Sequence, residues 1–165
     1  EPDLLVADEP TTALDVTIQA QVLAMVSDLR DRLGTSMLMI THDLGIVADF
    51  ADRIQVMYAG VIVEEGTKQE IFKKCRHPYT WALLRSIPSE GAAKNQLYSL
   101  KGTPPDLLLT NEGCPFASRC EYCMPICRQG NPEFTRLSNT HRTACWLMHE
   151  KAPKVKRPAE IGGEV

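Results

Sequence analysis

The sequence lacks three features that would assign it to a common class of protein. No apolar run approaches the roughly 18 residues of a membrane-spanning helix, and no signal-peptide pattern opens it. The formal net charge is only −3, which gives no electrostatic reason to bind nucleic acid or anionic lipid. With 44% hydrophobic and 24% charged residues, the 165-residue chain has the composition of a soluble globular protein, and we expect it to be cytoplasmic.

The first third of the chain alternates between strand and helix patterns. Residues 4–7 and 36–41 are short apolar runs, typical of strands buried in a parallel sheet. Between them lies a helical apolar pattern, which Asp15 can cap at its start and Gly34 can end. The apolar positions of this predicted helix are Ile18, Val22, Met25, Val26, Leu29 and Leu33.

A shorter helix is predicted over residues 43–52, and two strands joined at Ala59 and Gly60 follow it. The resulting order, β-α-β-α-β-β, predicts an α/β fold that corresponds to the last third of a doubly wound sheet. We therefore assign residues 1–66 to this sheet-and-helix core.

The second part of the chain changes character. Thr67 and Glu70 form a capping box, and Pro78 suits the first turn of another helix that ends at Pro88. Residues 67–88 are thus predicted to be connecting helices. Two further segments are expected: a small separate region over 89–150, and a charged, disordered tail over 151–165.

The opening stretch "LLVADEPTTALD" is an apolar strand that ends in two carboxylates. Such a strand places Asp8 and Glu9 at the carboxyl edge of a parallel sheet, where these folds bind ligands. Asp8 would hold a magnesium ion, usually through water, beside a nucleotide phosphate, and Glu9 would orient or deprotonate the attacking water. The alternative is a strand end that carries two solvated acids.

The residues that follow distinguish these alternatives. "DEPTTALD" precedes a predicted helix and then a strand ending in "ITHD", and this set resembles the ATP-binding cassette (ABC) ATPases. By that resemblance, Asp8 and Glu9 are the Walker B pair, and residues 11–15, including Asp15, form the loop that crosses to a partner subunit. His42 matches the switch histidine, which contacts the γ-phosphate and stabilises charge there. Outside this pattern, a lone histidine is usually structural.

Two motifs of the ABC ATPases are absent from the sequence. There is no phosphate-binding G-x-x-x-x-G-K-[ST] loop and no "SGGQ"-type signature. The resemblance is therefore to the C-terminal part of such a P-loop NTPase. By itself, this chain is expected neither to bind ATP tightly nor to hydrolyse it. The unpaired sheet edge and bare apolar surface of such a piece also favour self-association.

The second half contains four motifs in order: "HPYTWALLRSIP", "GTPPDL", "GCPFASRC" and "HRTACW". Together they resemble the C-terminal extension of the oligopeptide and dipeptide importer ATPases, a group that includes nickel importers. Within the first motif, His77, Pro78 and Tyr79 are predicted to have structural roles, because a histidine near a helix cap, a proline at its start and a packed aromatic residue explain them.

Five of the six cysteines lie between Cys114 and Cys145. Four soft ligands brought together from loops suit an iron–sulfur cluster or a structural zinc ion, and unligated thiols or disulfides are the alternative. The resemblance implies a [4Fe–4S] cluster that staples a small, loop-rich extension. The cysteines that match the pattern are Cys114, Cys120, Cys127 and Cys145.

Three residues near this pattern have other expected roles. Cys123 lies outside the pattern but is well placed to compete as a ligand, whereas Cys75 is predicted to be a bystander thiol. His141 lies close to Cys145 and is predicted to cap or pack more readily than to bind metal.

The resemblance implies an ATP-hydrolysing subunit that uses ATP and Mg²⁺ to power import of di- and oligopeptides. Its implied partners are a second ATPase subunit, two transmembrane permease subunits and an extracytoplasmic peptide-binding protein. Its implied location is the cytoplasmic face of the cell membrane. Two alternatives stay open: the same kind of ATPase serving nickel or another small solute, and a non-catalytic, metal-stapled regulatory or docking module.

Overall fold

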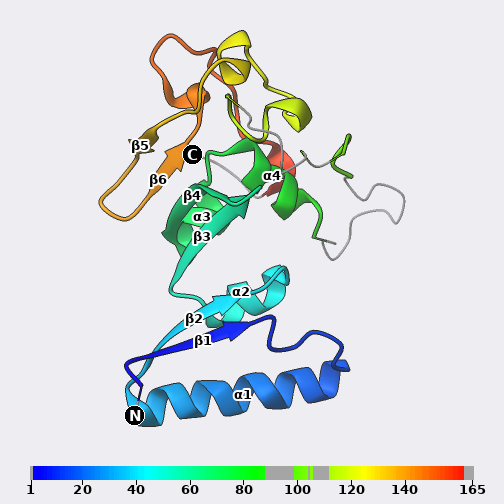
Figure 1. The fold of residues 1–165 in the computed structure, drawn as a ribbon, viewed down its shortest axis with the longest axis vertical. Helices are drawn as coiled ribbons and strands as arrows, with labels where there is room; N and C mark the ends of the chain where they lie inside the picture. Colours follow the sequence, from blue (N-terminus) through cyan, green and yellow to red (C-terminus); the bar gives the residue numbers. More distant parts are fainter. Residues whose placement is uncertain (1, 88–98, 104, 106–111, 162–165) are drawn as a thin grey trace. The chain divides into compact units, whose positions relative to one another are not determined.

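The computed structural model describes residues 2–87, 99–103, 105 and 112–161 (Figure 1). The chain divides into two compact units, Glu1–Ala51 (unit 1) and Asp52–Val165 (unit 2). Among the described residues, no helix combines the length and apolarity needed to cross a membrane. Residues 88–98, where the composition changes, and half of the "GTPPDL" motif lie outside the described residues.

Unit 1 is built around two parallel strands, β1 (Leu4–Asp8) and β2 (Ser36–Ile40). In their register Leu4 lies opposite Ser36, and Asp8 lies opposite Ile40, so both strands end at the same edge. Figure 1 draws α1 (Val16–Leu33) and α2 (Leu44–Phe50) on opposite sides of this pair. The predicted β-α-β-α order is confirmed for this part of the chain.

Helix α1 begins and ends at the predicted residues. The Asp15 side chain accepts a hydrogen bond from the Ile18 amide at 2.9 Å, which satisfies one of the free donors of the first turn. At the other end Gly34 adopts φ 62°, a left-handed conformation that glycine reaches at little cost, and its amide donates to the Arg30 carbonyl.

The expectation of buried apolar faces in unit 1 is wrong. The Val6 residue is 55% exposed, and Met25, on the predicted apolar stripe of α1, is 57% exposed. Within α1 only Leu23 is buried. Strands of a parallel sheet become buried when helices cover both faces, and the described elements of unit 1 cover little of either face.

Unit 2 begins with an antiparallel hairpin, β3 (Arg53–Tyr58) and β4 (Val61–Thr67). Its two-residue turn has φ 48° at Ala59 and φ 78° at Gly60, the left-handed pair that matches the twist of a hairpin. The turn lies at the predicted position.

The other edge of β4 pairs with a strand from the far end of the chain. The sheet order is β3-β4-β6-β5, with β5 at Phe134–Arg136 and β6 at Arg142–Ala144. The hairpin was predicted to continue the doubly wound core up to residue 66. Instead it joins the strands of the extension, because β6 pairs with Glu64 and Glu65. The chain accordingly divides into its two units between Ala51 and Asp52, and not near residues 66 or 88.

The two predicted helices of unit 2 are present. Helix α3 (Lys68–Lys74) begins with the predicted capping box of Thr67 and Glu70. Helix α4 (Pro78–Arg85) begins with Pro78 in its first turn, as predicted, and ends three residues before Pro88.

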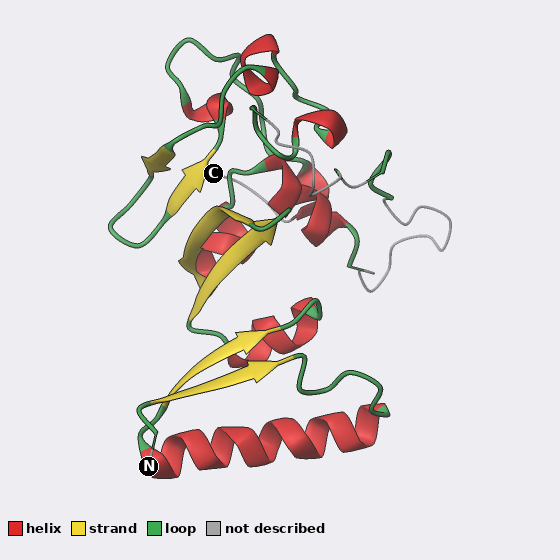
Figure 2. Ribbon diagram, viewed as in Figure 1, coloured by secondary structure: helices red, strands yellow, loops and turns green. Residues whose placement is uncertain are grey.

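From Gly113 to Ile161 the chain is mostly loop, interrupted by short helical turns and the β5–β6 pair (Figure 2). This confirms the predicted loop-rich character of the extension. The apolar core of unit 2 combines both halves of the chain, since Phe116 packs with residues of the hairpin and α3. Its buried members are Val56, Tyr58, Val63, Ile71 and Phe116.

Residues 151–161 do not form the predicted disordered tail. Arg157 donates hydrogen bonds to the carbonyl oxygens of Lys73 and Ile161, the latter at 2.8 Å. The segment then forms a 3₁₀ turn, η4 (Ala159–Ile161), which contacts α4. The guanidinium group therefore ties the charged segment to the end of α3. Residues 162–165 lie outside the described residues.

Candidate functional site

The acidic pair lies where β1 ends. Asp8 is the last residue of the strand and is exposed. The Glu9 amide donates to the Ile40 carbonyl at 2.8 Å, so Glu9 is attached to the end of the neighbouring parallel strand. Glu9 has φ 46°, an uncommon left-handed conformation for this residue type that turns the chain sharply out of the strand.

Glu9 and His42, predicted from separate segments, come together at this edge. His42 Nδ1 lies 2.9 Å from Glu9 Oε1. The His42 side chain is 80% exposed and the Glu9 side chain 41% exposed, so both are open to a ligand from solvent. The parallel register of β1 and β2 produces this proximity, because Glu9 lies one residue past the end of β1 and His42 lies two residues past the end of β2.

Thr12 is a third member of this group, and the sequence reasoning did not single it out. Its Oγ1 donates a 2.5 Å hydrogen bond to Glu9 Oε2, and its amide donates to the Glu9 carbonyl at 3.1 Å. A threonine three residues after the acidic residue, with Pro10 between them, is a turn pattern that signals such a contact.

The contacts shift the pKa of both ionisable partners. Hydrogen bonds from Thr12 and then from His42 lower the pKa of the Glu9 carboxyl, because both stabilise its ionised form. The hydrogen bond with Glu9, and then its charge, raise the pKa of His42. The pair thus favours a carboxylate beside a protonated imidazole at the exposed end of the sheet.

Asp15 and Asp43 lie at helix starts instead of joining this pair. Asp15 caps α1, as predicted. Asp43, also missed by the sequence reasoning, caps α2 by accepting from the Gly45 and Ile46 amides at 2.8 and 3.3 Å. Gln19 also donates to Asp43 at 3.4 Å, which connects the first turn of α1 to that of α2.

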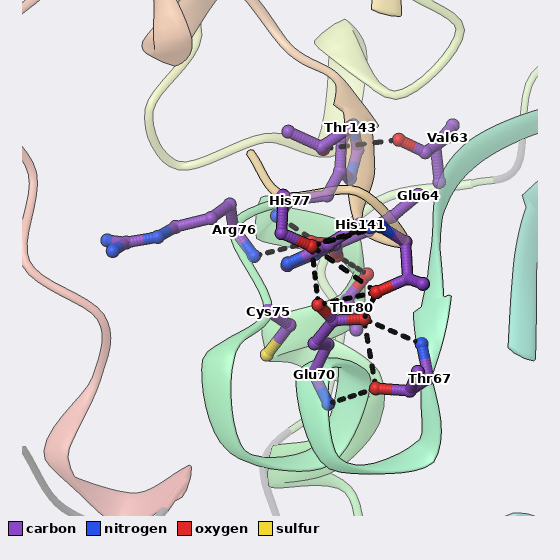
Figure 3. A network of polar contacts seen from close by, with 12 residues as sticks. Val63, Glu64, Thr67, Glu70, Cys75, Arg76, His77, Thr80, His141 and Thr143 are labelled. Atoms are coloured by element: carbon purple, nitrogen blue, oxygen red, sulfur yellow. Dashed lines mark hydrogen bonds and ion pairs between the residues drawn. The ribbon is translucent and has the colours of Figure 1, made fainter. Parts of the chain in front are cut away.

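Unit 2 contains a second polar group, centred on the fully buried Glu64 (Figure 3). The Arg76 amide donates to its Oε1 at 2.6 Å, and His141 Nε2 lies 2.9 Å from the same oxygen. Its Oε2 accepts from the His77 amide at 3.2 Å and from Thr80 Oγ1 at 2.6 Å. One carboxyl group thereby holds the start of α4 and the loop before β6.

A second carboxyl group fixes the same loop. Glu70 accepts hydrogen bonds from the hydroxyl groups of Ser138 and Thr140 at 2.6 and 2.9 Å, and from the Thr67 amide at 2.8 Å. Partial burial raises the pKa of Glu70, but these hydrogen bonds outweigh it and lower the pKa to about 2. Glu64 and Glu70 thus anchor residues 138–141 to the hairpin and α3.

The predicted structural roles of the "HPY" residues are confirmed. His77 is 1% exposed, and its ring accepts a hydrogen bond from the Tyr79 amide at the start of α4. Burial lowers the pKa of His77 to about 4, so the ring is neutral. Tyr79 packs against Tyr58 and Phe116, with ring centroids 4.6 and 5.3 Å away.

The cysteines of the extension are free thiols that influence one another. Burial is the main reason why the pKa of Cys120 and of Cys145 is raised to about 12. The charges of neighbouring cysteines raise the pKa of both thiols further. Burial also raises the pKa of Cys114 and Cys127. Cys123 lies beside this set, with its Sγ 3.6 Å from the Met124 carbonyl oxygen. Cys75 is fully buried at the C-terminal end of α3, and its carbonyl accepts a hydrogen bond from Trp81 Nε1.

The predicted metal centre has the expected donor chemistry but not the expected arrangement. Soft thiols from loops are the ligands that zinc and iron–sulfur clusters take. In the described part of the chain, however, no three or more His, Cys, Asp or Glu side chains are arranged to hold a metal ion. His141 contacts Glu64 instead, as its predicted structural role requires.

Comparison with known proteins identifies the class. Residues 63–127 match the sequence model of the family described as "Oligopeptide/dipeptide transporter, C-terminal region". This range runs from β4 to the third cysteine of the predicted pattern, so it includes both Glu64 and the "HPY" residues.

Individual relatives match nearly the whole chain. The oligopeptide transport ATP-binding protein OppD of Bacillus subtilis is 52% identical over 161 residues, which are 97% of this chain and 45% of that protein. The corresponding figures for AmiE of Streptococcus pneumoniae are the same. The dipeptide transport ATP-binding protein DppD of Lactococcus lactis is 50% identical over 155 residues, 94% of this chain and 44% of that protein.

Residues 63–127 match that family model, and over most of its length this chain is similar to oligopeptide and dipeptide transport ATP-binding proteins. The predicted resemblance is therefore confirmed. The chain spans less than half the length of the curated relatives that it matches.

Proposed function

We propose that this chain supplies the water-activating part of the ATP-hydrolysing subunit of an importer for di- and oligopeptides. The names of its relatives support the cargo class and ATP as the nucleotide. The observation that carries the proposed chemistry is the 2.9 Å contact between Glu9 and His42 at the carboxyl ends of neighbouring parallel strands.

Each residue of the group has a proposed role in phosphoryl transfer. Asp8, at the exposed end of β1, would hold Mg²⁺ through water, and the ion would neutralise charge on the phosphates. Glu9 would accept a hydrogen bond from the attacking water and align it with the γ-phosphate. His42 would contact a γ-phosphate oxygen and stabilise the negative charge that develops there.

The pKa directions favour one of two roles for Glu9. A general base works best when its pKa lies near the ambient pH, but the contacts with Thr12 and His42 lower that of Glu9. Glu9 is therefore better suited to orient and polarise water than to remove its proton fully before attack. The raised pKa of His42 suits a group that faces a phosphate anion.

The proposed assembly contains a second ATPase subunit, two transmembrane permease subunits and an extracytoplasmic peptide-binding protein, at the cytoplasmic face of the cell membrane. Residues 11–15, including Asp15, would form the contact with the second ATPase subunit. The relatives' names describe ATP-binding proteins of oligopeptide and dipeptide transport, which supports a transporter complex as the setting. Nickel or another small solute is the alternative cargo, because the permeases and the binding protein select it.

The test is magnesium-dependent ATP hydrolysis by the complete subunit that contains this chain, with Glu9→Gln as the variant. Glutamine cannot accept a proton and presents only one acceptor oxygen, so kcat is expected to fall by about a hundredfold or more. KM for ATP is expected to change little, because Glu9 would act on water. The 165-residue chain alone is expected to give no turnover.

Glu133→Gln is the control for this measurement, because Glu133 is an exposed residue of unit 2. Its hydrolysis rate is expected to equal that of the unchanged subunit. A Glu9→Gln subunit with an unchanged rate would contradict the catalytic assignment.

We also propose that Cys114, Cys120, Cys127 and Cys145 take up a metal, with a [4Fe–4S] cluster ahead of zinc. The mutual influence of these thiols, of which Cys127 is buried and the others are partly buried, supports a shared site, since a bound cation would compensate for four thiolates there. Such a centre has no open coordination position, so its role would be to stabilise the loop-rich extension.

The metal proposal is tested by purifying the protein without oxygen and measuring iron, sulfide and zinc together with the absorption spectrum. About four iron atoms and four sulfides per chain, with brown colour, are expected for the cluster. One zinc per chain and no colour would identify the alternative. Cys75→Ser, at the separate buried thiol, is the matched control and should keep the metal. Protein with neither metal would contradict the proposal.

A further inference from the structure

We propose that Thr12 is a positioning residue for Glu9, which sets the orientation of the water-orienting carboxyl group. The inference rests on the proposed role of Glu9 and adds a residue to it.

Thr12 holds Glu9 at two points. The Thr12 amide donates to the Glu9 carbonyl at 3.1 Å and closes the turn that Pro10 occupies, while its hydroxyl donates to Oε2 at 2.5 Å. The Glu9 backbone is fixed separately, through its amide, to Ile40 of β2. The backbone of Glu9 is thus anchored to the sheet, whereas its side chain is anchored to the loop.

The two carboxyl oxygens of Glu9 have different partners. Oε1 contacts His42 at 2.9 Å, and Oε2 contacts Thr12. Because the Glu9 side chain is 41% exposed, packing does little to restrict its rotation, and these two hydrogen bonds set the plane of the carboxyl group. His42 is expected to turn toward the γ-phosphate during hydrolysis, and Thr12 then remains as the contact that orients Glu9.

The loop that carries Thr12 is anchored at its far end as well. Leu14 donates through its amide to the Thr11 carbonyl at 3.2 Å, and Asp15 caps α1 through the Ile18 amide at 2.9 Å. This arrangement ties the start of α1 to the Glu9 side chain through a short, internally bonded segment. These contacts therefore hold Thr12, and with it the Glu9 side chain, in a fixed position relative to the start of α1.

The first test follows the titration of the Glu9 carboxyl carbon and the His42 ring by NMR in the 165-residue chain. Thr12→Val keeps the shape of the side chain but removes the hydroxyl. The lowered pKa of Glu9 is then expected to move up toward its ordinary value, because the first of its causes is lost. Thr12→Ser restores the donor and should keep the lowered pKa.

The second test measures kcat and KM of the complete subunit against pH. Thr12→Val is expected to lower kcat by about tenfold to a hundredfold through misorientation of Glu9, with KM for ATP within about twofold. Its acid limb should move to higher pH, since a Glu9 with a raised pKa stays protonated further up the pH scale. Thr12→Ser should recover kcat to within about threefold.

Thr17→Val is the matched control, because Thr17 is an exposed threonine in the first turn of α1. It should change neither the titration nor the rate. An unchanged Glu9 titration in Thr12→Val, or an equal loss of activity in Thr12→Ser, would overturn the inference. If the titration shifts as expected but Glu9→Gln leaves hydrolysis unchanged, the proposed function fails while the positioning contact stands.

Discussion

Replacement of Glu64 by alanine is expected to lower the free energy of unfolding of unit 2 by about 3–5 kcal/mol. The carboxyl group is fully buried and receives the Arg76 and His77 amides, the Thr80 hydroxyl and a contact from His141. Alanine leaves these polar groups buried without their partner, and it leaves a cavity between β4, α4 and the loop before β6. A loss of this size approaches the whole stability of an ordinary domain.

Urea unfolding followed by tryptophan fluorescence measures this effect, because both tryptophans, Trp81 and Trp146, belong to unit 2. Glu65→Gln is the matched control on the same strand. Glu65 contacts Arg142 and Arg53 at 2.8 and 3.6 Å, and because these arginines are 48% and 60% exposed and glutamine keeps an acceptor oxygen, the loss is expected to be about 1 kcal/mol. A Glu64→Ala effect as small as that of the control would contradict the central role of Glu64.

Gly113→Ala is expected to destabilise unit 2 by about 3 kcal/mol or more, at the upper end of overpacking effects. A Cβ atom at Gly113 would lie 2.4 Å from the Cys127 carbonyl oxygen and 2.8 Å from the carbonyl carbon of Arg128. Both are backbone atoms, which cannot rotate away as a flexible side chain can. The chain would have to separate where the Cys114 amide donates to Cys127 at 2.8 Å.

The same urea experiment tests this second variant. Gly130→Ala is its control, because a Cβ atom there meets only the Trp146 ring at 3.9 Å, an ordinary contact. Gly130→Ala is expected to change the free energy of unfolding by less than about 1 kcal/mol. If the two alanine variants are equally stable, the close approach of residue 113 to the backbone of Cys127 and Arg128 is wrong.

Local signals in the sequence were sufficient to predict most of the helices and strands. Asp15 and Gly34 bound α1, and Thr67 with Glu70 begins α3, because caps depend only on residues within one turn. The hairpin turn at Ala59 and Gly60 was predictable for the same reason. These features are encoded over a few residues, and the distant parts of the chain do not alter them.

The pairing of strands that are distant in the sequence could not be predicted in the same way. No local pattern shows that β4 would pair with β6 across the extension, so the boundary at Ala51 and Asp52 was missed. The charged composition of residues 151–161 predicted disorder, yet Arg157 binds the carbonyl of Lys73. Burial in unit 1 was overestimated because apolar periodicity indicates which face seeks a partner, not whether the described chain provides one.

In the candidate site, too, one contact could be predicted from the sequence and another could not. Parallel strand ends bring Glu9 and His42 together, which strand prediction alone implies. Thr12 was missed because its contribution depends on the left-handed conformation of Glu9, which folds the turn back onto the carboxyl group. No periodic pattern encodes such a conformation.

The β4–β6 pairing has a consequence for biosynthesis. Glu64 and its partner His141 are separated by 77 positions, and a ribosome releases the chain from its N-terminus. While the intervening residues are still being added, the nascent hairpin has one open edge and an acid without its imidazole partner. Unit 2 therefore matures late, after translation has passed the last cysteine, and a chaperone that shields the waiting hairpin would act in that interval.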